Sequence, residues 1–403
     1  MQITINDRSM SIDEGAAAPG MDVDFPAEVR VTVPGRARLV YSLTVGQWAV
    51  ATRVADDAYR LVVPAPALLR FNLQPGASRP VPPTTIPLVA RVQTQSLPLA
   101  RLGVVGAYGS SELACDAVER KRAQALRYLT SEQLVTSSDR GTRLRLADVN
   151  VLRRWREQNP GATIVYSALN GWPLDLRLLG STPEAAALVV RDWAKRTVDV
   201  VGGLVDFFEG PNEPANGEFN AQVRRGEKDW MAWLHTAWAG AVEELTHAGK
   251  PVAGPAYLNV DHIRAVHRDI PTLSALACHP YLNSANATSL EDGLKTLRSI
   301  ARTRPLLLSE LGPTRKPLDA SGKPDPNAQA QLAGELLDVA LRSADVVLLY
   351  TSRCYTPKLE QQCGHMALYT ITGQPRDPML AMYAQRLATQ VARFAARGQP
   401  VTA

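Results

Sequence analysis

Over the first ninety residues, apolar and polar positions alternate with a period of two. Five short stretches show this pattern, and Gly, Pro and Asp residues separate them. Such alternation buries one face of a strand and leaves the other in solvent, so it predicts half-buried strands. We therefore expect a small all-β, sandwich-like accessory domain over residues 1–90. Its predicted strands cover residues 2–6, 28–33, 37–45, 48–54 and 59–63.

A proline-rich segment closes this region. Proline has no backbone N–H and favours an extended chain, so the segment predicts a linker that ends near residue 90. The prolines concerned are Pro75, Pro80, Pro82, Pro83 and Pro87.

Beyond the linker, short apolar runs alternate with longer stretches of helical periodicity. Continuous apolar runs are typical of strands that are buried on both faces of a parallel sheet. Eight runs in roughly 250 residues match a (β/α)8 barrel, so we assign residues 91–403 to a catalytic TIM barrel of the α/β class. The runs span residues 101–108, 125–131, 162–170, 203–210, 251–259, 273–281, 304–310 and 345–352.

A doubly wound parallel sheet is the alternative architecture, because it also alternates strands and helices. Its nucleotide-binding fingerprint is missing at the end of the first run, where Gly103, Gly106 and Gly109 follow a GxxGxxG spacing. The dinucleotide motif needs GxGxxG, and no Gly-rich turn is followed by a phosphate-binding lysine. The barrel is therefore preferred, and no nucleotide cofactor is expected.

Two helices can be placed from their own patterns. The last helix is expected from Asp377, its N-cap, with Pro378 in the first turn. The other ends before Gly249, and its tryptophans are expected to pack against the barrel and not to serve as sugar platforms. Its apolar stripe contains Trp230, Trp233, Leu234, Ala237, Trp238, Ala241 and Leu245.

Composition narrows the functional classes. The chain has 403 residues, 45% hydrophobic and 21% charged, with 44 Lys and Arg against 39 Asp and Glu. The basic clusters 120–122 and 153–156 fall in predicted helices, so solvated helix faces are preferred over a nucleic-acid surface. No apolar run approaches the roughly 20 residues of a membrane span, and the N-terminus lacks the features of a secretory signal. We expect a cytoplasmic chain as written, or an extracellular one if a leader was removed or release is non-classical.

The cysteines and histidines give no metal or redox signature. The four cysteines form no CxxC pair, and the six histidines form no HxH or HExxH pair, so neither a metal centre nor a metal-dependent hydrolase is expected. Cys354 and Cys363 are close enough in sequence for a loop disulfide, with free thiols as the alternative.

Two glutamates follow predicted barrel strands. Glu213 comes just after the fourth run, and Glu310 ends the seventh. In a barrel, functional groups gather at the C-terminal strand ends, and strands four and seven lie across the ring from each other. Two facing carboxyl groups fit the cleavage of a glycosidic bond, in which one protonates the leaving oxygen and the other attacks the anomeric carbon.

Three segments resemble the retaining glycoside hydrolases of clan A. They are "FEGPNEP" across the end of the fourth run, "LLLSELG" across the end of the seventh and "CHPYLN" across the end of the sixth. The resemblance covers residues 97–396 and does not reach the level of one family. It implies that Glu213 is the acid/base and Glu310 the nucleophile.

The resemblance also implies roles for neighbouring residues. Asn212 would bind the sugar 2-hydroxyl, Tyr281 would donate to Glu310, and His279 would line the subsite or support Glu213. Tyr350 stands where clan members often have a tryptophan. Arg127 is either the strand-two arginine that supports the nucleophile or a solvated arginine at a helix end.

On the third run, Asn170 and Trp172 are placed at the barrel mouth, where the indole would stack on a sugar or simply pack. Together, these features predict a retaining hydrolase of β-linked glycosides or polysaccharides, with an oligo- or polysaccharide substrate, no cofactor and no nucleic-acid or membrane partner. The alternative is a non-catalytic carbohydrate-binding or adhesion protein on a glycosidase-like barrel. The sugar, the linkage, endo or exo action and the oligomeric state stay open.

Overall fold

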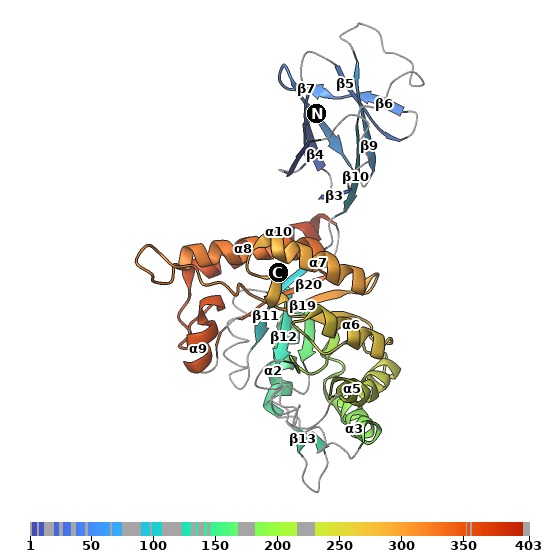
Figure 1. Ribbon diagram of the computed structural model, residues 1–403, viewed down its shortest axis with the longest axis vertical. Coiled ribbons are helices and arrows are strands. Elements are labelled where there is room, and N and C mark those ends of the chain that lie inside the picture. Colours follow the sequence, from blue (N-terminus) through green and yellow to red (C-terminus); the bar gives the residue numbers. More distant parts are fainter. Residues whose placement is uncertain are drawn as a thin grey trace. The chain divides into compact units, whose positions relative to one another are not determined.

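The computed structural model divides the chain into two compact units, Met1–Pro98 and Leu99–Ala403 (Figure 1). No helix among the described residues is long and apolar enough to cross a bilayer. The structure describes residues 2–5, 8–11, 20–23, 27–33, 38–44, 47–64, 67–74, 90–96, 99–106, 123–129, 134–135, 141–142, 146–167, 182–215, 230–351, 353–354 and 357–397.

The N-terminal unit contains two five-stranded sheets. They share one core, to which alternate residues such as Val29 and Val31 contribute from the first sheet and Leu69 and Phe71 from the second. The first sheet has the order β2 (Arg8–Ser11), β1 (Gln2–Ile5), β4 (Ala27–Thr32), β8 (Ala58–Val63) and β7 (Thr52–Arg53). The second has the order β3 (Gly20–Val23), β10 (Ala90–Ser96), β9 (Leu68–Gln74), β5 (Arg38–Thr44) and β6 (Gln47–Val50).

The division between the units falls after the position expected from the sequence. Strand β10 pairs with β9, so residues 90–96 belong to the N-terminal unit, whereas the sequence pattern placed the boundary near residue 90. The proline-rich segment 75–87 lies outside the described residues.

The second unit contains eight parallel strands in chain order around a ring. Strand β11 pairs with both β12 and β20, and isolated bridges between Ala253 and Ala275 and between Tyr257 and Cys278 connect the β17 and β18 segments. The expected (β/α)8 barrel is thereby confirmed. Its strands are β11 (Arg101–Gly106), β12 (Ala125–Leu129), β15 (Thr163–Ser167), β16 (Phe207–Glu209), β17 (Val252–Ala253), β18 (Leu276–Cys278), β19 (Leu306–Leu311) and β20 (Val346–Leu349).

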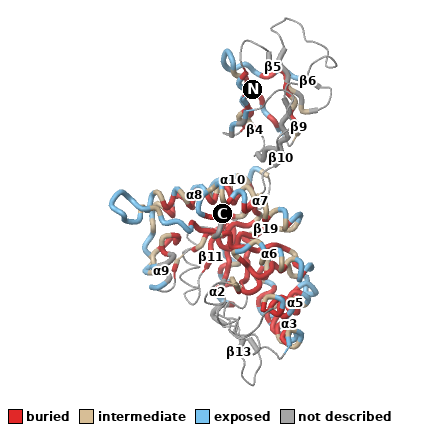
Figure 2. The backbone as a smooth tube through the Cα atoms, in the orientation of Figure 1, coloured by how far each residue is buried: buried red, intermediate tan, exposed pale blue. Residues whose placement is uncertain are grey.

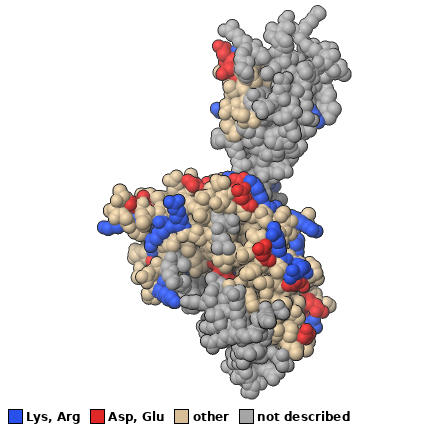
Figure 3. All heavy atoms as spheres, viewed as in Figure 1, with Lys and Arg blue, Asp and Glu red and all other residues tan. Residues whose placement is uncertain are grey.

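Helices follow the barrel strands and cover the outside of the ring. Buried residues are concentrated in the strands and on the inner sides of these helices (Figure 2). Acidic and basic side chains are interspersed over the outer helices on the face shown in Figure 3. The main helices are α2 (Leu146–Gln158), α3 (Pro183–Val201), α5 (Trp230–His247), α6 (Val260–Asp269), α7 (Ala287–Ala301), α8 (Pro326–Ser343), α9 (Pro357–Cys363) and α10 (Asp377–Ala396).

The two helices placed from the sequence are present. All seven residues of the α5 stripe are buried, including its three tryptophans, and Gly249 after the helix has φ of 71°. Helix α10 begins one residue earlier than expected, at Asp377 instead of Pro378. Arg376 is its N-cap and makes no side-chain cap bond, so the expectation that Asp377 caps the helix is wrong; Asp377 lies in the first turn.

The barrel interior changes from apolar to polar toward the C-terminal strand ends. Ala125 and Val165 lie in an inner apolar cluster. Side chains on one face of a strand recur every second residue, so two residues further along, Arg127 and Ser167 face the same interior. Glu209 is the last residue of β16 and is equally buried. A polar floor is thus built under the mouth of the barrel.

Candidate active site

Arg127 is the centre of a buried polar cluster on three adjacent strands. Its Nε donates to Oε1 of Glu209 at 2.8 Å, its Nη2 donates to the same oxygen, and Nη2 also donates to Oγ of Ser167 at 3.0 Å. All three side chains are fully buried. A buried arginine needs a carboxylate and further acceptors to offset its lost hydration, and this cluster supplies both. Arg127 therefore lies inside the barrel and not at a solvated helix end.

The same guanidinium connects strand seven to the end of strand four. Nη1 donates to Oε1 of Glu310 at 2.5 Å, and Nη2 donates to Oδ1 of Asn212 at 2.7 Å. The planar guanidinium presents its donors in a fixed geometry. Both acceptors are therefore fixed in direction as well as in distance.

Glu310 is buried and has a second donor. The hydroxyl of Tyr281 donates to its Oε2 at 3.1 Å. Burial raises the pKa of Glu310, and the charges of His279 and Arg127 and the Tyr281 hydrogen bond oppose that rise. Burial also keeps the pKa of Tyr281 well above its ordinary value, so the phenol stays protonated and remains a donor.

Glu213 is held by its backbone and by one imidazole. Its φ is 43°, which is uncommon for a residue with a side chain, and its N–H donates to the carbonyl of Ala256 at 3.0 Å. Its Oε1 lies 2.6 Å from Nδ1 of the fully buried His279. The proton in that bond belongs to the imidazole or to the carboxyl group, depending on their charge states.

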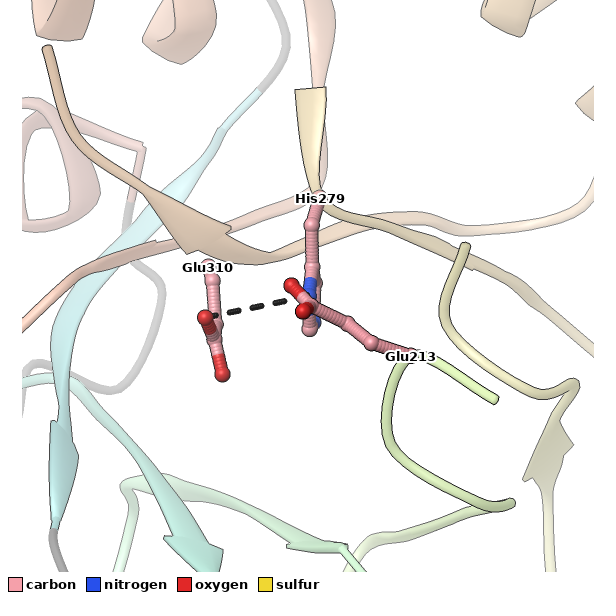
Figure 4. A group of neighbouring side chains, drawn as sticks. All are labelled: Glu213, His279 and Glu310. Carbon is pink, nitrogen blue, oxygen red and sulfur yellow. Dashed lines mark hydrogen bonds and ion pairs between the residues drawn. The ribbon is translucent and has the colours of Figure 1, made fainter. Parts of the chain in front are cut away.

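The two glutamates meet at His279. One carboxylate oxygen of each glutamate and one ring nitrogen of His279 all lie within 4.8 Å of one another, and Nδ1 of His279 is 3.7 Å from Oε2 of Glu310. Figure 4 shows the carboxyl group of Glu213 pointing toward Glu310, with the imidazole beside both. The ends of strands four, six and seven thus supply one acid–base cluster.

The same three side chains have ligand atoms that suit a metal ion. Both oxygens of Glu310 already accept hydrogen bonds, one of them from a guanidinium at 2.5 Å. That fixed positive charge opposes a second cation at the same carboxylate. The donor set therefore favours proton transfer and nucleophilic attack over metal binding.

Of the remaining candidate residues, only some lie among the residues that the structure describes. Tyr350 follows β20, its ring is perpendicular to that of Tyr281 with centroids 6.3 Å apart, and the Tyr350–Thr351 peptide bond is cis. Asn170, Trp172 and the side chain of Cys363 lie outside the described residues, so the mouth position of the first two and the Cys354–Cys363 disulfide stay predictions.

Two parts of the site were not assigned from the sequence. Ser167 contacts Arg127 and Glu209, and the signal for it is a polar residue at the end of an otherwise apolar strand. The carbonyl of Ala256 supports Glu213 through the backbone, for which no residue type gives a signal.

Comparisons with known proteins identify the fold. No family model matches the chain, and no curated protein matches its sequence. Among solved structures, it is similar to a Bacteroides ovatus xyloglucanase of glycoside hydrolase family 5, in complex with a XXXG heptasaccharide, with a TM-score of 0.50 and 12% identity over 90% of this chain and 96% of that chain.

Two other solved structures are similar. A psychrophilic endo-β-1,4-xylanase of glycoside hydrolase family 10 has a TM-score of 0.50 and 12% identity, over 70% of this chain and 96% of that chain. A β-glycosidase has a TM-score of 0.51 and 12% identity, over 72% and 97%. The barrel therefore has the (β/α)8 fold of these glycoside hydrolases. At this identity the likeness extends to the fold alone.

Proposed function

We propose that the chain is a retaining glycoside hydrolase that cleaves β-linked glycosides or polysaccharides by double displacement. The supporting observation is the approach of Glu213 and Glu310, whose nearest oxygens lie within 4.8 Å. Retaining enzymes hold their two carboxyl groups about 5–5.5 Å apart, whereas inverting enzymes leave about 6.5–9.5 Å for a water molecule. The separation fits direct attack on the sugar.

Glu310 is the proposed nucleophile. Attack on the anomeric carbon needs an ionised carboxylate, and donors to the ionised form stabilise it. Arg127 and Tyr281 each donate to one of its oxygens. These contacts favour the charged form of Glu310 against the effect of its burial.

Glu213 is the proposed acid/base. Two carboxyl groups this close do not both ionise freely, and the charged donor, Arg127, contacts Glu310. We therefore assign the negative charge to Glu310 and the proton to Glu213. Glu213 would protonate the leaving oxygen in the first step and would take a proton from water in the second.

Asn212 is the proposed contact to the sugar 2-hydroxyl. Arg127 occupies its amide oxygen, which leaves the amide NH2 as the group that can donate to substrate. This assignment of the amide follows from the hydrogen bond to a donor-only guanidinium. A hydrogen bond to the 2-hydroxyl strengthens in the transition state, so it would contribute to turnover more than to binding.

A panel of chromogenic β-glycosides and plant and bacterial polysaccharides tests the proposal. Glu310→Ala should abolish turnover of every substrate that the wild type cleaves. Glu213→Ala should spare substrates whose leaving groups need no protonation. Glu335→Ala, which changes an exposed glutamate of α8, is the control and should match the wild type.

The outcomes separate the candidate functions. Wild-type protein that binds glycans and cleaves none of them would support the carbohydrate-binding alternative. Equal losses in Glu213→Ala and Glu310→Ala on activated aryl glycosides would contradict the division of roles.

A further inference from the structure

The segment after β17 supports both members of the Glu213–His279 pair. The carbonyl of Ala256 accepts the N–H of Glu213 at 3.0 Å, and the carbonyl of Tyr257 accepts the N–H of His279 at 3.1 Å. Strand β17 itself is only two residues long, and Pro255 offers no N–H to a ladder. The carbonyls of two consecutive residues thus hold the backbones of Glu213 and His279, although the regular strand ends before these carbonyls.

A chain of hydrogen bonds between three side chains, Tyr257, His235 and Asp269, anchors this segment. The hydroxyl of Tyr257 lies 2.9 Å from Nε2 of His235 on α5, and Nδ1 of His235 lies 2.7 Å from Asp269 at the end of α6. Tyr257 is fully buried, and His235 is 1% exposed. Neither His235 nor Asp269 touches the two glutamates in any contact described above.

The hydrogen-bond directions follow from the partners. A carboxylate is an acceptor, so Nδ1–H of His235 donates to Asp269, and the bare Nε2 accepts from the Tyr257 hydroxyl. Burial lowers the pKa of His235, while its hydrogen bond to Asp269 opposes that shift. Arg268 donates to the other oxygen of Asp269 at 2.8 Å and fixes the end of the chain.

Glu213 depends on such support because of its backbone. A glutamate with φ of 43° occupies a sparsely populated conformation, which persists only where the surrounding structure imposes it. The Ala256 carbonyl and His279 are two of the contacts that hold Glu213 there, and both depend on residues 256–257.

We propose that Tyr257 and His235 are positioning residues for the acid/base step. The Asp269–His235 pair fixes the Tyr257 hydroxyl, and the carbonyls of residues 256 and 257 then hold Glu213 against His279. This inference rests on the proposed glycosidase function. Glu310 accepts its charged hydrogen bond from Arg127 on β12, outside this segment, so loss of the anchor should impair protonation of the leaving group and spare nucleophilic attack.

Tyr257→Phe removes the anchoring hydroxyl. Its effect is measured on two glycosides of one sugar, a 2,4-dinitrophenyl glycoside and an alkyl glycoside, because only the second needs an acid. We expect kcat/KM to fall about 10-fold or more on the alkyl glycoside and less than about 2-fold on the dinitrophenyl glycoside. Tyr383→Phe is the matched control. Its hydroxyl on α10 is buried with no partner among the described residues, and both rates should be unchanged.

Two variants of His235 test the hydrogen-bond directions along Tyr257, His235 and Asp269. His235→Gln can keep an acceptor near the position of Nε2, whereas His235→Asn keeps only a donor near Nδ1. We expect His235→Asn to reproduce the loss seen in Tyr257→Phe, and His235→Gln to retain most of the activity on the alkyl glycoside. If Tyr257→Phe fails to fold, as judged by thermal melting, this pair decides the question.

Equal losses on both glycosides in these variants would overturn the inference, as would wild-type rates in Tyr257→Phe. Glu213→Ala, assayed beside them, separates this failure from failure of the proposed function. If Glu213→Ala spares the dinitrophenyl glycoside and the anchor variants do not discriminate, only the positioning role is wrong. If Glu213→Ala does not discriminate either, the acid assignment itself is wrong.

Discussion

Arg127 donates a 2.5 Å hydrogen bond to Oε1 of Glu310, and neither side chain has more than 7% of its surface exposed. The same guanidinium forms a buried ion pair with Glu209. One cation therefore serves two buried carboxylates. Glu209 offsets part of the positive charge, and Glu310 keeps a strong donor without being the sole partner of Arg127.

Removal of the guanidinium should impair the ionisation of Glu310. Arg127 opposes the burial that raises the pKa of Glu310, so in Arg127→Met that pKa should rise further. The acid limb of kcat/KM against pH reports this ionisation and should move to higher pH, with kcat/KM lowered about 10²-fold or more at neutral pH. Arg127→Lys keeps the charge and should shift the limb less. Arg264→Met, at an exposed arginine of α6, is the control, and an unmoved acid limb in Arg127→Met would count against the proposed nucleophile.

Tyr281→Phe should have a smaller effect of the same sign. The phenol donates to the ionised form of Glu310 and lowers its pKa. Without that bond the acid limb should again move toward higher pH, by less than in Arg127→Met because no charge is lost. The pH profile on a dinitrophenyl glycoside measures this, with Tyr383→Phe as the control. A shift toward lower pH would show that Tyr281 does not stabilise the carboxylate.

Asn212→Ala should lower kcat and kcat/KM together by about 10² or more, with KM little changed. The reason is that the amide is proposed to hold the 2-hydroxyl mainly in the transition state. A 2-deoxy substrate should be poor for the wild type but should lose little further in the variant, because the partner group is already absent. If the two losses simply multiply, Asn212 positions Glu213 or its loop and does not contact the sugar.

The close packing of α3 on α5 gives a prediction about stability. A Cβ on Gly240 would lie 2.2 Å from the backbone oxygen of Ala187, and backbone cannot move aside as a flexible side chain can. Gly240→Ala should therefore destabilise the protein by about 1–3 kcal/mol. Gly203→Ala is the matched control, because a Cβ there meets nothing within 4 Å. Thermal melting of the two variants compares them, and equal melting temperatures would show that the helices can separate at little cost.

The barrel could be predicted because its strands are apolar on both faces. Each of the eight strands lies in one of the eight runs, in the expected order, and only β19 extends one residue past its run, to Leu311. The strands of the N-terminal unit are harder to predict from the sequence. Strands β2 and β10 are rich in polar residues, and β10 is separated from its partner β9 by the proline-rich segment. Such strands form because of pairing with distant strands and not because of their own pattern.

The position of the candidate site could be predicted, but most of its contacts could not. Asn212 and Glu213 come just after the fourth apolar run and Glu310 ends the seventh, so their places at the barrel mouth follow from the topology. The sequence alone could not decide whether Arg127 is buried in the barrel or solvated at a helix end, because its burial depends on Glu209, 82 residues away. The Tyr257–His235–Asp269 chain depends in the same way on contacts between helices and strand ends. His235 is the local signal, as a polar residue next to the apolar stripe of α5.

Chemical rescue of the two glutamate variants by azide tests the central claim most directly. Glu213→Ala and Glu310→Ala are incubated with azide and a dinitrophenyl β-glycoside that the wild type cleaves, and NMR determines the configuration of each glycosyl azide. With Glu213→Ala, azide should attack the glycosyl–Glu310 intermediate and give the β-azide. With Glu310→Ala, azide should take the place of the missing nucleophile and give the α-azide. The reverse pattern, or the same anomer from both variants, would contradict the assignment of Glu310 as nucleophile and Glu213 as acid/base.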